Sequence, residues 1–122
     1  MEITLIDMEK EFLEKKHMGI EFFFMEYFKE LKGYLKNSIF NETGKIELSI
    51  RKRENDKEEL DKFSCNGCKD GKKKNDRIEL EFEKIEKVDR SESRGKILYR
   101  VFIDGEEKVG IAISNERDPS AC

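Results

Sequence analysis

The chain has 122 residues, of which 43% are charged and 36% are hydrophobic, and its formal net charge at pH 7 is -3. This balance excludes the strongly basic surface of a protein that binds nucleic acid mainly through its phosphates. No apolar run approaches the roughly 18 residues of a transmembrane helix. The length suits a single domain, 1–122. The N-terminus lacks the features of a signal peptide, so we expect a protein of the host-cell cytoplasm with reduced cysteines.

The first third of the chain predicts one long amphipathic helix, from residue 8 to about residue 36. Asp7 is the expected N-cap, because a side-chain oxygen at this position accepts a hydrogen bond from the first helical turn. Apolar residues recur at spacings of three and four along one predicted face, at Ile20, Phe24, Phe28, Leu31 and Leu35.

The rest of the chain predicts antiparallel β-structure. Apolar residues alternate with polar ones or form short β-rich runs in four segments, at 45–51, 77–88, 96–103 and 108–114. Asp104 and Gly105 predict a tight hairpin turn between the last two segments. The predicted fold class is α+β, a two-layer sandwich in which the long N-terminal helix packs on an antiparallel meander of about four strands.

Three glutamates, Glu79, Glu81 and Glu83, alternate with apolar residues in the clearest predicted strand. Alternate residues on a strand lie ~6.7 Å apart on one face, a spacing comparable to that of phosphates along a nucleic acid. Together with Glu47, they predict an acidic sheet face that binds the basic channel of another protein. The alternative is an ordinary solvated face that discourages pairing between sheet edges.

Four consecutive apolar residues, 22–25, cannot all be covered by one sheet if they are helical. In that arrangement Phe22, Met25 and Lys29 mark the outward face, and we expect them to mediate self-association or partner binding. The alternative is complete burial within one protomer.

Two cysteines, Cys65 and Cys68, are weak candidates for a zinc site. A zinc ion in a structural site needs four ligands, and the chain has three cysteines and one histidine. Cys122 and His17 would have to complete the site. We therefore expect no metal and no cofactor, and interpret the two thiols as incidental.

A basic loop follows the second cysteine and contains Lys69, Lys72, Lys73, Lys74 and Arg77. Such a cluster can contact phosphate, but the segment lacks the aromatic residues that stack on bases. We interpret it as a solvated loop and expect no strong direct binding of nucleic acid.

Catalytic motifs are missing from the sequence, including nucleotide-binding glycine loops and the nucleophile motifs of hydrolases. A histidine-dependent relay would rest on His17 alone. We therefore expect a protein that is not an enzyme.

In its general type, a short, slightly acidic, Lys- and Glu-rich domain, the chain resembles the small inhibitors encoded by phages and mobile elements, such as anti-CRISPR proteins. It also resembles bacterial immunity proteins that neutralise toxins. The resemblance lies in length and composition, and no single motif carries it. It implies a non-catalytic inhibitor that occludes a larger cytosolic protein, most readily a nuclease complex. The alternatives are a homodimeric regulatory or toxin-immunity protein and a protein that sequesters a small nucleotide signal.

Overall fold

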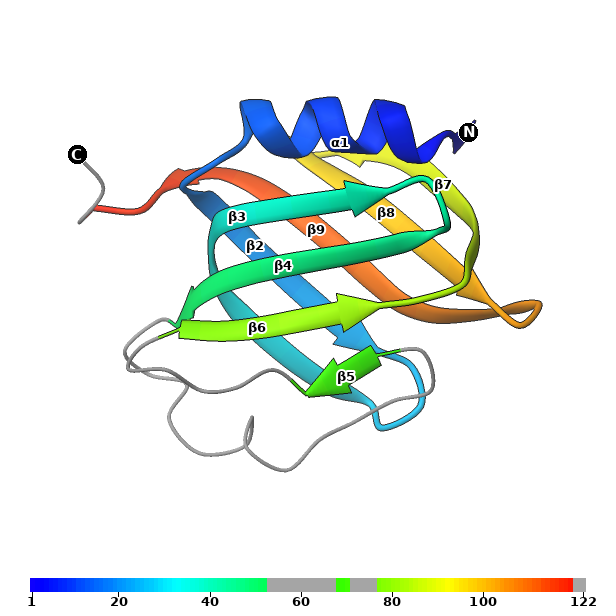
Figure 1. The fold of residues 1–122 in the computed structure, drawn as a ribbon. Helices are drawn as coiled ribbons and strands as arrows, with labels where there is room; N and C mark the ends of the chain where they lie inside the picture. The colour runs from blue at the N-terminus through cyan, green and yellow to red at the C-terminus, as the bar shows by residue number, and fades with distance from the viewer. Residues whose placement is uncertain (53–67, 71–76, 120–122) are drawn as a thin grey trace.

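The computed structural model describes residues 1–52, 68–70 and 77–119. These residues form one nine-stranded sheet and one short helix (Figure 1). In chain order the elements are β1 (Glu2–Ile3), α1 (Leu5–Glu14), β2 (Met18–Phe24), β3 (Lys29–Asn41), β4 (Lys45–Lys52), β5 (Cys68–Asp70), β6 (Arg77–Phe82), β7 (Ile85–Ser93), β8 (Lys96–Ile103) and β9 (Glu106–Arg117).

The sheet curls so that one of its faces encloses the core. Its strand order is β1-β7-β8-β9-β2-β3-β4-β6-β5, and all neighbours are antiparallel. In Figure 1, β3, β4 and β6 pass in front of β8 and β9. The rings of Phe22 in β2 and Phe82 in β6 have centroids 6.5 Å apart, although two strands separate β2 from β6 in the sheet. The strands therefore meet across the core as well as along the sheet.

The helix α1 covers one opening of the curled sheet (Figure 1). Its residues Met8 and Phe12 are buried. The ring of Phe12 lies 5.4 Å from the rings of both Phe40 in β3 and Tyr99 in β8. These contacts join two parts of the sheet that are separated by β9 and β2. The helix thus completes a core that the strands alone leave open.

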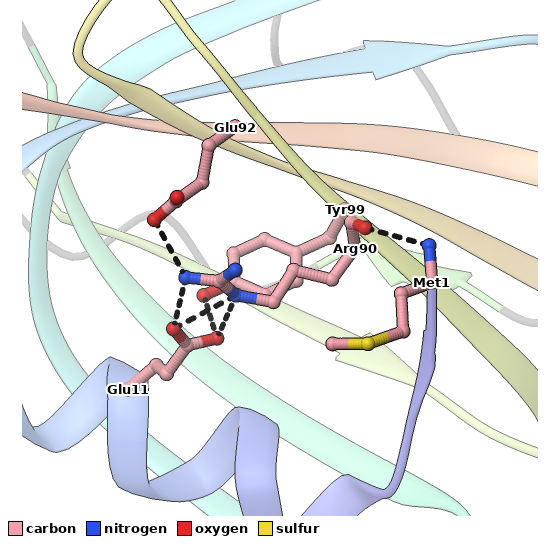
Figure 2. A network of polar contacts seen from close by, with 5 residues as sticks. All are labelled: Met1, Glu11, Arg90, Glu92 and Tyr99. Atoms are coloured by element: carbon pink, nitrogen blue, oxygen red, sulfur yellow. Dashed lines mark hydrogen bonds and ion pairs between the residues drawn. The ribbon is translucent and has the colours of Figure 1, made fainter.

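A carboxylate, Glu11, fastens α1 to the sheet (Figure 2). Arg90 Nε in β7 donates to both oxygens of Glu11 at 2.8 and 2.9 Å, and Tyr99 Oη donates to Glu11 Oε1 at 2.9 Å. Hydrogen bonding to Glu11 raises the pKa of Arg90, and burial raises the pKa of Tyr99. Arg90 also bonds Glu92 at 3.0 Å, and its carbonyl accepts a hydrogen bond from the amine of Met1 at 2.9 Å. The network therefore ties the first fourteen residues to β7 and β8.

The predicted two-layer sandwich is wrong. The helix ends at Glu14, and the segment expected to continue it forms β2 and β3. Exposure alternates along β2: Phe22 and Phe24 are buried, whereas Phe23 between them is half-buried. Such alternation defines a strand, and aromatic residues favour the pleated surface of a sheet. His17, between the helix and β2, has a φ of 73°, which a continuous helix does not allow.

The helix also begins earlier than expected. Its N-cap is Thr4, whose Oγ1 accepts a hydrogen bond from the backbone N–H of Asp7 at 3.1 Å. Asp7, the expected N-cap, lies in the first turn, where its carboxylate suits the positive end of the helix dipole.

The later strands follow the sequence prediction more closely. The expected segments 45–51 and 96–103 correspond to β4 and β8, and 108–114 lies inside β9. The segment 77–88 divides at Lys84, whose φ is 60°, into β6 and β7. The hairpin at Asp104 and Gly105 is confirmed, with φ values of 55° and 74°. Both residues have the positive φ that the tight turn requires.

Candidate protein-binding surface

Carboxylates gather on β4, on β6 and directly after β6, and we refer to them as the acidic patch: Glu47, Glu79, Glu81 and Glu83. Along β6 the alternate residues enter the core, as Ile78, Leu80 and Phe82 are all buried. Glu79 and Glu81 lie between them and therefore point to the outer face of the sheet. The pairing of β4 with β6 places Glu47 opposite Glu81, and Glu83 follows the end of β6.

The acidic patch brings like charges together. Glu47 lies directly opposite Glu81 in the register of β4 and β6, and Glu79 lies opposite Ser49. Like charges directly opposite one another destabilise a sheet. The side chain of Glu47 is 46% exposed and that of Glu81 is 23% exposed, and Glu79 is also exposed. The patch is thus accessible from outside the domain, and Lys45, which lies near both Glu47 and Glu81, offsets part of their repulsion.

Lys45 lies close to the carboxylates of the acidic patch. Its Nζ is 2.8 Å from Glu81 Oε1 and 3.7 Å from Glu47 Oε1. A hydrogen bond from Lys45 to Glu81 raises the pKa of the Lys45 ammonium, and the negative charges of Glu81, Glu47 and Glu83 raise it further. Three of the four glutamates thus raise the pKa of the same lysine, which shows that their negative charges lie close together.

The residues expected to mediate self-association do not share one face. Phe22 is 1% exposed and lies in the core. Met25 is half-buried in the turn after β2, and Lys29 is exposed at the start of β3. Grouping them depended on a helical period, which the strand structure replaces. Phe22 is therefore unable to contact a partner protein.

The two candidate zinc ligands are only partly placed. Cys65 lies outside the described residues, whereas Cys68 is the first residue of β5 and pairs with Phe82 in register. Among the residues that the structure describes, no three His, Cys, Asp or Glu side chains are grouped as around a metal ion.

Part of the basic loop also lies outside the described residues, namely Lys72, Lys73 and Lys74. Lys69 lies in the strand β5, so the expectation of a loop is wrong at this position, and its backbone pairs with that of Glu81. Arg77 begins β6.

A buried ionic cluster, which sequence analysis missed, fastens the end of β9. Asp118 is 1% exposed and Lys36 is 7% exposed. Lys36 Nζ lies 2.5 Å from Asp118 Oδ2, and Arg51 Nη1 lies 2.8 Å from Asp118 Oδ1. The two cations come from β3 and β4, and the backbone N–H of Asp118 donates to the carbonyl of His17 at 2.8 Å. The carboxylate of Asp118 thus joins the end of β9 to β3 and β4, and its backbone N–H adds a link to the segment before β2.

The sequence held only a faint signal of this cluster. Lys36 stands where the pairing of β3 with β4 shifts register, between Leu35 and Asn37. A bulge of this kind redirects a side chain, and bulges are hard to place without knowing the pairing. The charged groups of the cluster form ion pairs with one another, and we interpret the cluster as structural.

The stability of the protein should fall as the pH drops below the ordinary His17 pKa of 6.5. Partial burial and the charges of Lys36, Arg117 and Lys16 lower the pKa of His17 in the folded state. The unfolded chain therefore binds the proton first, and protonation favours unfolding until the folded-state pKa is passed. Urea unfolding at a series of pH values between neutral and mildly acidic measures this dependence.

The matched variant for this experiment is His17→Asn, because asparagine tolerates the positive φ of this position and does not titrate. Its stability should change less over the same pH range than that of the wild type. Equal slopes for the two proteins would show that another group is responsible.

The fold and the acidic patch define a small antiparallel β domain with a strongly charged outer face. Within residues 1–52, 68–70 and 77–119, no helix has the length and apolar character needed to cross a membrane. No family model, curated protein or solved structure significantly matches this chain.

Proposed function

We propose that this protein is a non-catalytic binding protein that inhibits a larger, nucleic-acid-handling protein by occluding its basic channel. The observation that carries the proposal is the acidic patch, in which Glu47 and Glu81 face each other across two registered strands. Lys45 within the domain already binds this pair of carboxylates, which supports a further contact with the cations of another protein. The proposed setting is the cytoplasm of a host cell, as for the phage-encoded inhibitors that the chain resembles in type.

The proposed contact is electrostatic and steric. Lysine and arginine side chains of the target would approach Glu47 and Glu79, which are exposed. Complementary charge speeds the encounter and selects the orientation, and its effect falls as salt is added. The rigid strands β4 and β6 hold the carboxylates in place, so few side-chain rotamers are lost on binding. Binding in the channel would then exclude the nucleic acid.

Charge reversal tests this proposal. The variant Glu79→Lys/Glu81→Lys/Glu83→Lys should lose at least about tenfold in affinity for its target, because repulsion replaces attraction at three positions. The measurement is the displacement of a fluorescent oligonucleotide from each member of a panel of purified nucleases, together with the rate of substrate cleavage. Raising the salt concentration should weaken inhibition by the wild type.

The control carries the same change in net charge on the other side of the fold, in β1 and α1: Glu2→Lys/Glu9→Lys/Glu14→Lys. It should inhibit as the wild type does. Thermal unfolding of both triple variants checks that they fold, and the neutral variant with glutamine at positions 79, 81 and 83 retains the shape without the repulsion. Equal inhibition by the patch variant and the wild type would refute the electrostatic mechanism. A wild type that inhibits no nuclease would refute the proposed class of target.

Sequestration of a small nucleotide remains an alternative from the sequence. It would use Lys72, Lys73 and Lys74, which lie outside the described residues.

A further inference from the structure

A shallow groove of about 250 Å³ lies on the outer face of the sheet, away from the acidic patch. The outer surfaces of Gly110 and Ala112 in β9 form its floor, and Phe23 in β2 and Leu98 in β8 are among the residues that line it. A Cβ atom added at Gly110 would have one neighbour within 4 Å, Met25 Cε at 3.8 Å. The space over Gly110 is therefore open and can receive a side chain from another molecule.

The groove belongs to a cross-strand row with a distinctive order. Gly110 lies opposite Arg100 on one side and opposite Phe23 on the other, and Phe23 in turn lies opposite Glu30. From β8 to β3 the row therefore reads basic, small, large aromatic, acidic. Consider a two-fold axis that is parallel to the strands and passes between Gly110 and Phe23. Rotation about this axis places Phe23 of one copy over Gly110 of the other, and the basic end of the row over the acidic end. The row is complementary to a second copy of itself.

Aromatic residues extend this surface. Phe28, the last residue of the β2–β3 turn, is 79% exposed, and its ring lies 6.4 Å from that of Phe23 in an edge-to-face contact. Phe102 in β8 lies beneath the cationic groups of Lys87 and Arg100, at 4.8 and 5.5 Å. The same half-turn brings Phe102 towards Phe28 of the second copy. Aromatic residues of this kind are enriched at protein–protein interfaces.

We propose that this face is the interface of a two-fold homodimer, with its axis parallel to the strands between β9 and β2. The ring of Phe23 in each copy fills the groove over Gly110 of the other copy. Arg100 of each copy meets Glu30 of the other. Two sheets packed face to face lie ~10 Å apart, and the small residues of β9 leave room for the incoming ring. The interface is isologous, so each contact forms twice.

The charges of the row remain available for this contact. The Arg100 side chain is 55% exposed; within the protomer its Nε donates to Glu107 at 2.8 Å, and its Nη1 lies 3.8 Å from Asp89 Oδ2. A guanidinium carries five donor hydrogens, so its outer nitrogen atoms can also bind a carboxylate of the second copy. Glu30 is exposed at the start of β3. A different partner would need to match both the shape of the groove and the order of its charges.

Sedimentation velocity of the full chain over a range of concentrations tests the proposal. The molar mass obtained for the wild type should be twice the 14.5 kDa of one chain. Gly110→Leu should be monomeric, because its side chain fills the groove that receives Phe23. Its thermal unfolding at low protein concentration should match that of the wild type, since a Cβ at this position meets only Met25 Cε, at 3.8 Å, an ordinary van der Waals contact.

Exchanged charges identify the interface more sharply. Arg100→Glu alone and Glu30→Arg alone should each weaken dimerisation at least about tenfold, because each places like charges in contact. An equimolar mixture of the two variants should form a heterodimer, because Glu at position 100 of one copy then meets Arg at position 30 of the other, and both contacts are restored. Capture of the untagged variant by the tagged one measures this.

A wild type that is monomeric at every concentration overturns the proposal. So does a dimer that Gly110→Leu leaves intact, or a pair of charge variants that are dimeric alone and gain nothing on mixing. None of these substitutions touches the acidic patch. The outcome is therefore independent of the inhibition experiment, and either proposal can fail without the other.

Discussion

Replacing Asp118 by asparagine should lower the free energy of unfolding by about 3–5 kcal/mol, the usual effect of removing one partner from a buried ion pair. Lys36 would remain in the protein with 7% of its surface exposed and without its counter-charge. Arg51 can turn towards solvent more easily, because 25% of its side chain is already exposed. Urea denaturation followed by circular dichroism measures the change. For a domain whose total stability lies in the usual range of about 5–15 kcal/mol, this is a large fraction.

The matched control is Asp104→Asn, the same chemical change at an exposed turn, which should be close to neutral. A second variant tests the cause. Adding Lys36→Met to Asp118→Asn removes the stranded cation and should recover much of the lost stability. If Asp118→Asn unfolds at the same urea concentration as the wild type, the ionic cluster does not hold the end of β9.

Replacing Phe22 by alanine should destabilise the protein by about 3–5 kcal/mol, because the substitution leaves a cavity in the core. Phe22 is 1% exposed and its ring stacks on Phe24 and Phe82, with centroids 6.0 and 6.5 Å apart. Equilibrium denaturation measures the loss, and thermal unfolding provides a second measure.

Phe23→Ala is the matched control, one residue along the same strand. Its side chain lies on the outer face, so at a protein concentration below dimerisation the change in stability should stay within about 1 kcal/mol. Phe22→Ala should thus lower the stability of the fold much more than Phe23→Ala does. Phe23→Ala should instead have the larger effect on dimerisation. Similar losses of stability for both variants would contradict the strand alternation.

The expectation of a long helix failed because of a coincidence of periods. Ile20 and Phe24 are spaced by four residues, and a spacing of four satisfies both the helical repeat and the alternation of a strand. Phe28 continues this spacing in the sequence, but it lies in the β2–β3 turn and is 79% exposed. The β2–β3 turn separates Phe24 from Leu31, so the alternation of the two strands is not continuous there. In a helix, the spacing of three residues from Phe28 to Leu31 is regular, and it hid this turn. Phe22, an apolar residue on the even positions, was the sign of a strand. The local pattern did not distinguish Phe22 from its neighbour Phe23, because both belong to one continuous apolar run.

The acidic patch was accessible to prediction because its signal is local. Within β6, the alternation of glutamates with buried residues fixes which side chains point outward, and the pattern alone predicted this. That Glu47 lies opposite Glu81 depends on the pairing of β4 with β6. The sequence does not contain this register in any one segment, because it arises from contacts between distant residues.

Local sequence pattern was sufficient to predict β4, β6, β8, the central part of β9, the tight hairpin and the outward glutamates of β6. All of these follow from period-two alternation and turn chemistry, which act between neighbouring residues. Contacts between distant strands were needed to place β5, to separate β6 from β7, to make the aromatic segment a hairpin, to curl the sheet around the core and to bring Asp118 to Lys36. These features depend on which strands pair and how far the sheet bends, and long-range contacts fix both.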